Sequence, residues 1–172
     1  MKNQTNNDFV VSRVFDAPRD LVWKAFTDPE QMKQWWGPTG FTAVASKMDL
    51  RPGGTYHYGM TAPNGMAMWG LFRYREVTPP ERLVVIDCFS DENGGVTRHP
   101  GNAQWPLEML STFTFQDLPG GQTMFTIRWA AHNATAEEQK VFDASHDSMT
   151  QGWSGTLERL EAYLAKAKRT AR

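Results

Sequence analysis

The hydrophobic pattern changes period once along the chain, and this change limits the folds that the chain can adopt. From residue 41 to residue 132, strand-like segments follow one another with turn residues between them and no helical pattern. From Ala136 to Lys166 there is no proline, and apolar residues recur at three- and four-residue spacing. Because no helices separate these strands, most neighbours are expected to pair antiparallel. The pattern predicts an antiparallel sheet followed by one amphipathic helix of about thirty residues.

Seven segments have the composition of strands, with β-branched and aromatic residues bounded by Gly, Pro, Asn or Asp. They are residues 9–15, 41–50, 55–60, 66–77, 82–89, 107–116 and 123–132. The last two flank Pro119-Gly120-Gly121, which predicts a hairpin. Alternation does not determine which side chains of residues 66–77 point inward, because a bulge at Gly70 would exchange the two faces of the strand beyond it.

Two short helices are predicted between the first and second strands. Pro18 is expected at the first helical position of one, where a missing N–H has no cost. Asp28 is expected to cap the other, which stops at Gly37-Pro38. For the last helix, Thr135 and Glu138 have the spacing of a capping box.

These elements predict an α+β fold in one domain of the 172-residue chain. The domain spans residues 8–166, and residues 1–7 and 167–172 are tails. A curved antiparallel sheet of about six or seven strands wraps around the long C-terminal helix, with the two short helices after the first strand. The middle of such a concavity can lie farther from the helix than side chains reach. Either large side chains fill that space or a cavity remains.

Composition narrows the classes of function. The net charge is −1, so no strong field for nucleic acid or anionic membrane is expected. The single cysteine, Cys88, excludes an internal disulfide and is interpreted as a small buried hydrophobe. The N-terminus lacks an apolar run, and no stretch is long enough to span a bilayer, so a cytoplasmic location is expected.

The sequence contains no recognisable catalytic motif. The histidines lack the spacing of a zinc site, so neither a metal nor another cofactor is predicted; they are His57, His99, His132 and His146. Asp87 and Glu108 interrupt apolar runs and are expected to face water on alternating strands. Whether any reaction occurs is therefore left open.

Residues 90–106 fit no regular element. The segment is polar, glycine-rich and seventeen residues long. A structureless loop of that length is uncommon, so it is interpreted as a lid or a disordered excursion.

Several motifs carry a resemblance to a known family. They are EQMKQWWGPTGF, MDLRPGGTY, YREVTPPERLVV, STFTFQDLPGGQT and QGWSGTLERLEAYL, over about residues 8–165. The chain resembles the activator-of-heat-shock-protein-ATPase homologue family of the START-like, birch-pollen-allergen-like helix-grip superfamily. The resemblance implies the helix-grip fold derived above and an association with stress response. Members of the superfamily bind lipids, hormones and polyketides, and some act as cyclases, so the fold alone does not choose a function.

Seven Trp, ten Phe and nine Met are many for one domain, and they are expected to line its interior. Of the adjacent Trp35 and Trp36, one can anchor the short helix while the other faces the mouth of the concavity; alternatively, both are packing anchors. Strand alternation and helical spacing predict an inward set that lines a ligand site, comprising Trp36, Tyr56, Tyr58, Trp69, Met109, Phe113, Trp129, Met149 and Trp153. The alternative is that these residues only close the core.

Three functions are compatible with these features. The first is binding of a small hydrophobic molecule, aromatic or polyketide-like, in a cavity between the sheet and the C-terminal helix. The second is a cyclase- or hydrolase-type enzyme that uses the same cavity. The third and less favoured is an interaction domain like the chaperone activators. A weak homodimer through an exposed strand edge is compatible with each.

Overall fold

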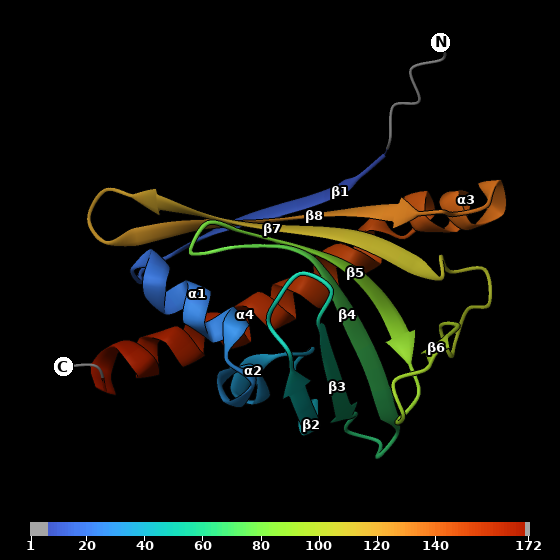
Figure 1. Cartoon of the computed structure of the whole chain (residues 1–172), viewed down its shortest axis with the longest axis horizontal. Helices are drawn as coiled ribbons and strands as arrows, with labels where there is room; N and C mark the ends of the chain where they lie inside the picture. Colours follow the sequence, from blue (N-terminus) through green and yellow to red (C-terminus); the bar gives the residue numbers. More distant parts are fainter. Residues whose placement is uncertain (1–6, 171–172) are drawn as a thin grey trace, which may run out of the picture.

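The computed structural model describes residues 7–170 as one curved sheet with a long helix across it (Figure 1). The elements in chain order are β1 (Phe9–Phe15), α1 (Arg19–Thr27), α2 (Pro29–Trp35), β2 (Thr42–Met48), β3 (Thr55–Thr61), β4 (Ala67–Thr78), β5 (Arg82–Ser90), β6 (Val96–Thr97), β7 (Glu108–Leu118), β8 (Gln122–His132), α3 (Ala136–Ala144) and α4 (His146–Thr170).

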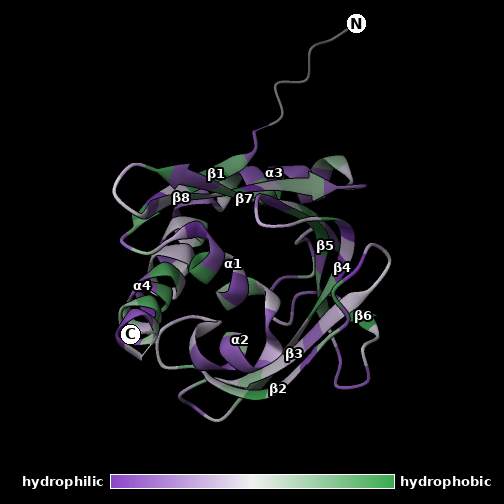
Figure 2. Ribbon diagram, turned by 60° about the vertical axis from the view of Figure 1, so that its left-hand side comes forward, coloured by the Kyte–Doolittle hydropathy of each residue, from purple (hydrophilic) through white to green (hydrophobic). Residues whose placement is uncertain are grey.

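The sheet has the strand order β1-β8-β7-β5-β4-β3-β2, and β6 pairs with β5 outside this path. Every strand pairing is antiparallel, as predicted from the absence of intervening helices. Seen from the side, the sheet curls from β1 at one end to β2 at the other, and α4 lies along its open side (Figure 2). The α+β helix-grip prediction is confirmed.

Side chains alternate between buried and less buried along β7, and Met109 and Phe113 point inward as predicted. Met109, Phe113 and Phe115 are buried, while Thr112 and Thr114 on the opposite face are less so. The hairpin between these strands is also confirmed, with positive φ at Gly120 and Gly121, where glycine has no steric cost.

The strand register determines which side chains of β4 lie on the concave face of the sheet. Tyr58 on β3 pairs with Gly70, so Gly70 and Phe72 share the concave face with Tyr58. Trp69 therefore points to the convex face, where its ring stacks on His57 at 5.2 Å between centroids. The strand does carry an irregularity, but between Tyr74 and Glu76 rather than at Gly70.

Two glycines allow aromatic rings to lie flat on neighbouring strands. A Cβ added at Gly70 would stand 2.2 Å from the Tyr58 ring and hydroxyl, and one at Gly59 would stand 2.6 Å from the Trp69 ring. A larger residue at either position would force the neighbouring ring to shift, which favours glycine at both.

Helix caps follow the sequence closely, but the predicted single C-terminal helix does not form. The Asp28 side chain accepts from the Glu30 N–H, and Thr135 and Glu138 form the reciprocal capping box. Pro18 is the N-cap of α1, one position before that predicted. The last helix is interrupted at Ser145, with φ −103° and ψ 7°, which separates α3 from α4. Thus α4 has 25 residues.

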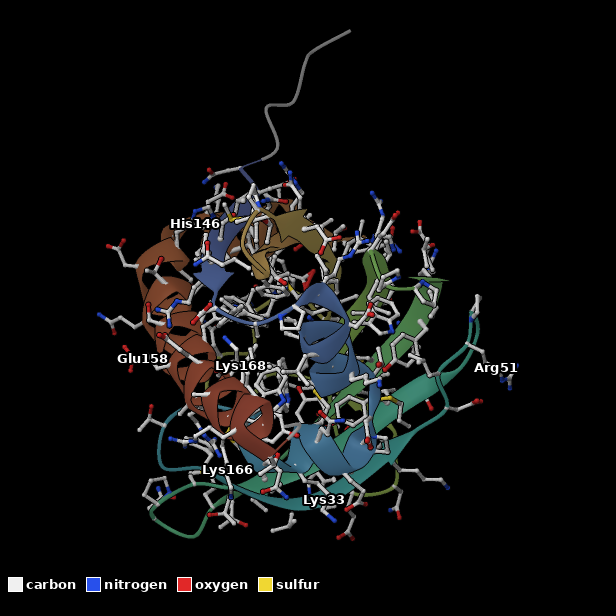
Figure 3. The ribbon with its side chains drawn as sticks, turned by 90° about the vertical axis from the view of Figure 1, so that its left-hand side faces the viewer. Lys33, Arg51, His146, Glu158, Lys166 and Lys168 are labelled. Atoms are coloured by element: carbon white, nitrogen blue, oxygen red, sulfur yellow. The ribbon has the colours of Figure 1, made fainter. Side chains whose placement is uncertain are left out.

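The interior is filled with aromatic rings beneath α1. Phe26 stacks on Phe125 with centroids 4.9 Å apart and meets Phe115 edge to face at 5.3 Å. Trp23 adds a further edge-to-face contact with Phe115. These rings close one half of the concavity, and the space that remains lies towards the N-terminal half of α4. Charged side chains, including Lys33, Glu158 and Lys166, point outward from the helices (Figure 3).

Candidate ligand-binding pocket

A cavity of about 460 Å³ lies between the concave face of the sheet and α4. The helix contributes Ser148, Met149, Gly152, Trp153 and Thr156, with Ser145 just before them. The concave face contributes Tyr58, Met60, Met68, Asp87, Phe89, Met109 and Trp129. Two connections complete the wall: the α2–β2 turn with Trp36, Gly37 and Pro38, and the β6–β7 connection with His99, Asn102, Trp105 and Pro106.

The adjacent tryptophans divide their roles. Trp35 has no exposed surface, and its Nε1–H donates to the Ala25 carbonyl oxygen at 3.1 Å. Trp36 follows the last residue of α2 and lines the pocket, with its ring edge to face against Trp153 at 5.7 Å. One ring anchors the helix and the other faces the cavity, as the first of the two interpretations predicted.

The turn that presents Trp36 is held by a residue far along the chain. The Arg159 guanidinium on α4 donates to the carbonyl oxygens of Gly37 and Pro38, both at 3.0 Å, and to that of Trp36 at 3.4 Å. Partial burial lowers the pKa of Arg159 from its ordinary value. A charged donor shared by three carbonyl groups fixes the turn against the helix.

Seven of the nine predicted site residues border the pocket. They are Trp36, Tyr58, Trp69, Met109, Trp129, Met149 and Trp153. For Trp69 the predicted inward orientation is wrong, because the register of β4 turns its ring to the convex face, and it borders the pocket only from the strand itself. Tyr56 and Phe113 lie outside the lining: both are at most 1% exposed, because they sit farther along their strands towards the filled half of the core.

Tryptophan rings form one side of the pocket. Trp129 and Trp153 meet edge to face at 5.5 Å, and Met149 lies one turn before Trp153 on α4. The indole nitrogens of Trp36 and Trp129 are buried and have no hydrogen-bond partner within the part of the chain that the structure describes. Because these atoms have almost no accessible surface, the rings of Trp36 and Trp129 offer a guest mainly their carbon atoms.

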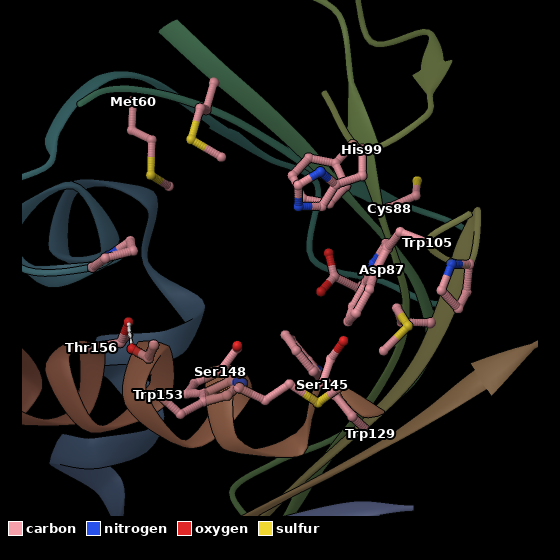
Figure 4. Close-up of a pocket in the computed structure, with 18 of the residues that line it drawn as sticks. Met60, Asp87, Cys88, His99, Trp105, Trp129, Ser145, Ser148, Trp153 and Thr156 are labelled. Atoms are coloured by element: carbon pink, nitrogen blue, oxygen red, sulfur yellow. Dashed lines mark hydrogen bonds between the residues drawn. The ribbon is translucent and has the colours of Figure 1, made fainter. Parts of the chain in front are cut away.

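Asp87 overturns an expectation from the sequence. It was expected to face water, but it pairs with Phe72 and Met109, both on the concave face. Its carboxylate points into the pocket (Figure 4). Within residues 7–170 this carboxylate has no hydrogen bond or ion pair. Enclosure by protein raises the pKa of Asp87 to about 7, because the charged form loses hydration.

Strand alternation alone could not have identified Asp87 as a residue of the pocket. Leu83 and Val85 point inward with it, but Val84 and Ile86 on the opposite face are also apolar. Where the side chains on both faces of a strand are apolar, their alternation does not show which face points into the core.

His99 enters the pocket from the β6–β7 connection. Its Nδ1 accepts the Gly101 N–H at 2.8 Å, so the neutral ring carries its proton on Nε2. The ring meets Phe89 at 4.8 Å between centroids, and burial lowers its pKa from the ordinary value. It adds a neutral polar group to the wall.

The other histidines lie elsewhere. His57 is on the convex face against Trp69, and His146 packs edge to face on Phe9 and Phe142. Among residues 7–170 there is no cluster of three or more His, Cys, Asp or Glu that could hold a metal ion.

Cys88 is 5% exposed, and burial raises the pKa of its thiol to about 11, which opposes a nucleophilic role at neutral pH.

The predicted lid is an ordered part of the wall. Residues 90–106 contain β6, which pairs with β5, so the segment is not structureless. Arg98 donates to Glu138 at 2.6 Å and ties the segment to the start of α3. Glu138 also accepts from the Thr135 N–H, and this bond together with Arg98 lowers the pKa of its carboxyl group. A pair 40 residues apart thus holds the segment that carries His99 and Trp105 against α3.

Comparison with known proteins identifies the family. Residues 16–165 match the family described as Activator of Hsp90 ATPase homolog 1-like protein. No curated protein matches the chain. In the described residues, no helix is both long and apolar enough to cross a membrane.

Three solved structures illustrate the likeness. A protein of Nitrosomonas europaea is 26% identical over 94% of this chain and 96% of its own, with a TM-score of 0.72. A Mycobacterium smegmatis protein is 26% identical over 95% of this chain and 94% of its own, with a TM-score of 0.74. An Arthrobacter aurescens protein is 26% identical over 96% of this chain and 90% of its own, with a TM-score of 0.77.

Proposed function

We propose that this chain, which belongs to the family of Activator of Hsp90 ATPase homolog 1-like proteins, binds a small, mainly apolar molecule between the sheet and α4. The observation that carries the proposal is the cavity of about 460 Å³, walled largely by tryptophan and methionine. A concave, mostly apolar space of this size beside a core otherwise full of rings has the form of a small-molecule site.

Size and surface both suit a flat apolar guest. Pockets for small molecules usually have volumes of about 300–1,000 Å³ and few polar groups. Here ring faces and edges of Trp36, Trp129 and Trp153 meet the space, and Met149 can adjust its shape to a guest.

A cavity-filling variant tests the proposal. Ser148 and Thr150 are both exposed on the first turns of α4, but only Ser148 borders the pocket. We expect 1-naphthalenemethanol to bind the natural protein in calorimetry and raise its melting temperature. Ser148→Trp is expected to abolish both effects, and the matched Thr150→Trp to preserve them. Equal binding by both variants would place the compound outside the pocket and contradict the proposal.

Asp87 favours a second candidate, an enzyme of the cyclase or hydrolase kind with Asp87 as general base. A carboxylate with a pKa raised to about 7 in an apolar cavity is well poised for proton abstraction. The probe 5-nitrobenzisoxazole tests this: the base takes the C3 proton, the C–H electrons complete a nitrile, and the N–O bond breaks to leave a phenolate. Turnover that disappears in Asp87→Asn supports the enzyme, and equal turnover in both proteins rejects it.

The remaining expectations stay predictions. Cytoplasmic location and weak self-association await cell fractionation and sedimentation. Chaperone activation, which the family name describes, gains no support from the features of residues 7–170.

A further inference from the structure

Asp87 is the one side chain with a formal charge among the described residues that line the pocket, and no lysine or arginine accompanies it. The other polar groups of the wall are neutral, including the Tyr58 hydroxyl, the His99 imidazole and the Asn102 amide. When Asp87 is ionised, it gives the pocket a negative potential. Two cations, Arg98 and Arg159, contact the wall from outside the lining, where their guanidinium groups donate to backbone carbonyl oxygens.

The surroundings of Asp87 supply no compensation. Tyr58 faces it from β3 and Met109 from β7, and burial raises the pKa of Tyr58 well above its ordinary value, so that group stays neutral. Arg73 is a nearby cation, but it lies on the convex face and is paired with Glu108. A carboxylate enclosed without a partner is destabilising, so a partner brought by the ligand would bind with correspondingly greater effect.

Aromatic rings around the carboxylate add a second attraction for positive charge. The faces of indole rings attract ammonium groups within about 6 Å, most strongly where water is excluded. Trp36, Trp105, Trp129 and Trp153 all border the same space. An anionic guest, in contrast, would meet Asp87 without any cationic side chain to receive it.

We propose that the pocket selects protonated organic amines with a flat apolar body, the ammonium group pairing with Asp87 and the body lying among the tryptophan rings. This inference rests on the proposed function and names its class of ligand. A neutral molecule of the same shape binds more weakly, and an anionic one weakest of all.

Three compounds of nearly equal shape separate the outcomes. They are 1-naphthylmethylamine, which is cationic, 1-naphthalenemethanol, which is neutral, and 1-naphthoate, which is anionic. At about pH 8, where Asp87 is ionised, we expect the amine to bind about tenfold or more tightly than the alcohol in calorimetry. As the pH falls through about 7, amine affinity is expected to drop while alcohol affinity stays constant.

Two variants assign the preference to one carboxylate. Asp87→Asn keeps the shape of the side chain and is expected to equalise the amine and the alcohol, with alcohol binding retained as evidence of an intact fold. Asp147→Asn changes the net charge by the same amount at an exposed α4 residue outside the lining, and is expected to keep the preference. Equal binding of amine and alcohol by the natural protein, or a preference that survives Asp87→Asn, would overturn the inference. Failure of all three compounds to bind would overturn the pocket proposal as well.

Discussion

The rings of Trp35 and Trp36, neighbours in the chain, stand nearly perpendicular, at 85° with centroids 5.6 Å apart. Trp35 is fully buried beside Phe26, whereas Trp36 borders the cavity. The two adjacent tryptophans thus have different roles. Trp35 stabilises the packing of the short helices, and Trp36 forms part of the pocket wall.

Substitution of these two residues should separate stability from binding. Trp35→Leu removes a buried ring and its hydrogen bond to Ala25, and is expected to cost about 3 kcal/mol of unfolding free energy in urea titrations. Trp36→Leu is expected to cost about 1 kcal/mol, because its ring is only partly buried, yet to weaken 1-naphthalenemethanol binding more than Trp35→Leu does. Equal stability losses would contradict the division of roles.

Arg159 is predicted to stabilise the turn that carries Trp36. Arg159→Met retains the apolar stem but removes the donor to Gly37 and Pro38, and is expected to cost about 2 kcal/mol. Lys166→Met, at an exposed cation on the same helix, serves as the control and is expected to change stability by less than about 0.5 kcal/mol. Unfolding curves in urea measure both, and similar values for the two variants would show that these bonds contribute little.

Substitution by alanine is expected to have opposite effects on protein stability at two glycines. A methyl group at Gly70 would collide with the Tyr58 ring, so Gly70→Ala is expected to destabilise the protein by about 2 kcal/mol. At Gly152, within α4, an added Cβ meets nothing within 4 Å, so Gly152→Ala is expected to stabilise by about 0.5–1 kcal/mol through helix propensity. Thermal unfolding measures both shifts, and a neutral Gly70→Ala would show that the Tyr58 ring moves freely.

The link between Arg98 and Glu138 should control the wall formed by residues 98–106. Arg98→Ala is expected to speed amide hydrogen exchange there about fivefold, equivalent to about 1 kcal/mol, while the β7–β8 hairpin exchanges as before. Arg51→Ala, which removes an exposed pair with nearby Asp49, is the control and should change neither region. Unaltered exchange in Arg98→Ala would mean that β6 and Trp105 hold the wall without the ion pair.

The stability of the empty protein should depend on pH through Asp87. Because its folded pKa of about 7 lies above the ordinary 3.8, the folded state binds the proton more tightly, and stability falls as pH rises between these values. Asp87→Asn is expected to be more stable than the natural protein at about pH 8, by on the order of 2 kcal/mol since the pocket admits water, and to lose this advantage near pH 4. Denaturant unfolding at several pH values measures the difference; an advantage that grows in acid would reverse the sign and contradict the assignment.

Local sequence patterns determined much of the secondary structure of this protein. The sequence predicted the antiparallel sheet, the β7–β8 hairpin, the inward orientation of Met109 and Phe113, and the caps at Asp28 and Thr135. These features depend on residues within a few positions of one another, through side-chain alternation and hydrogen bonds of single turns.

The tertiary structure decided the pocket. Both faces of β5 are apolar, so only pairing with β4 and β7 turned Asp87 inward, and only the fit of Tyr58 over Gly70 set the phase of β4. The break at Ser145 and the closure by Arg98 and Glu138 likewise depend on the assembled molecule. Where a segment is equally apolar on both sides, or where partners lie tens of residues apart, local periodicity carries no information and packing decides.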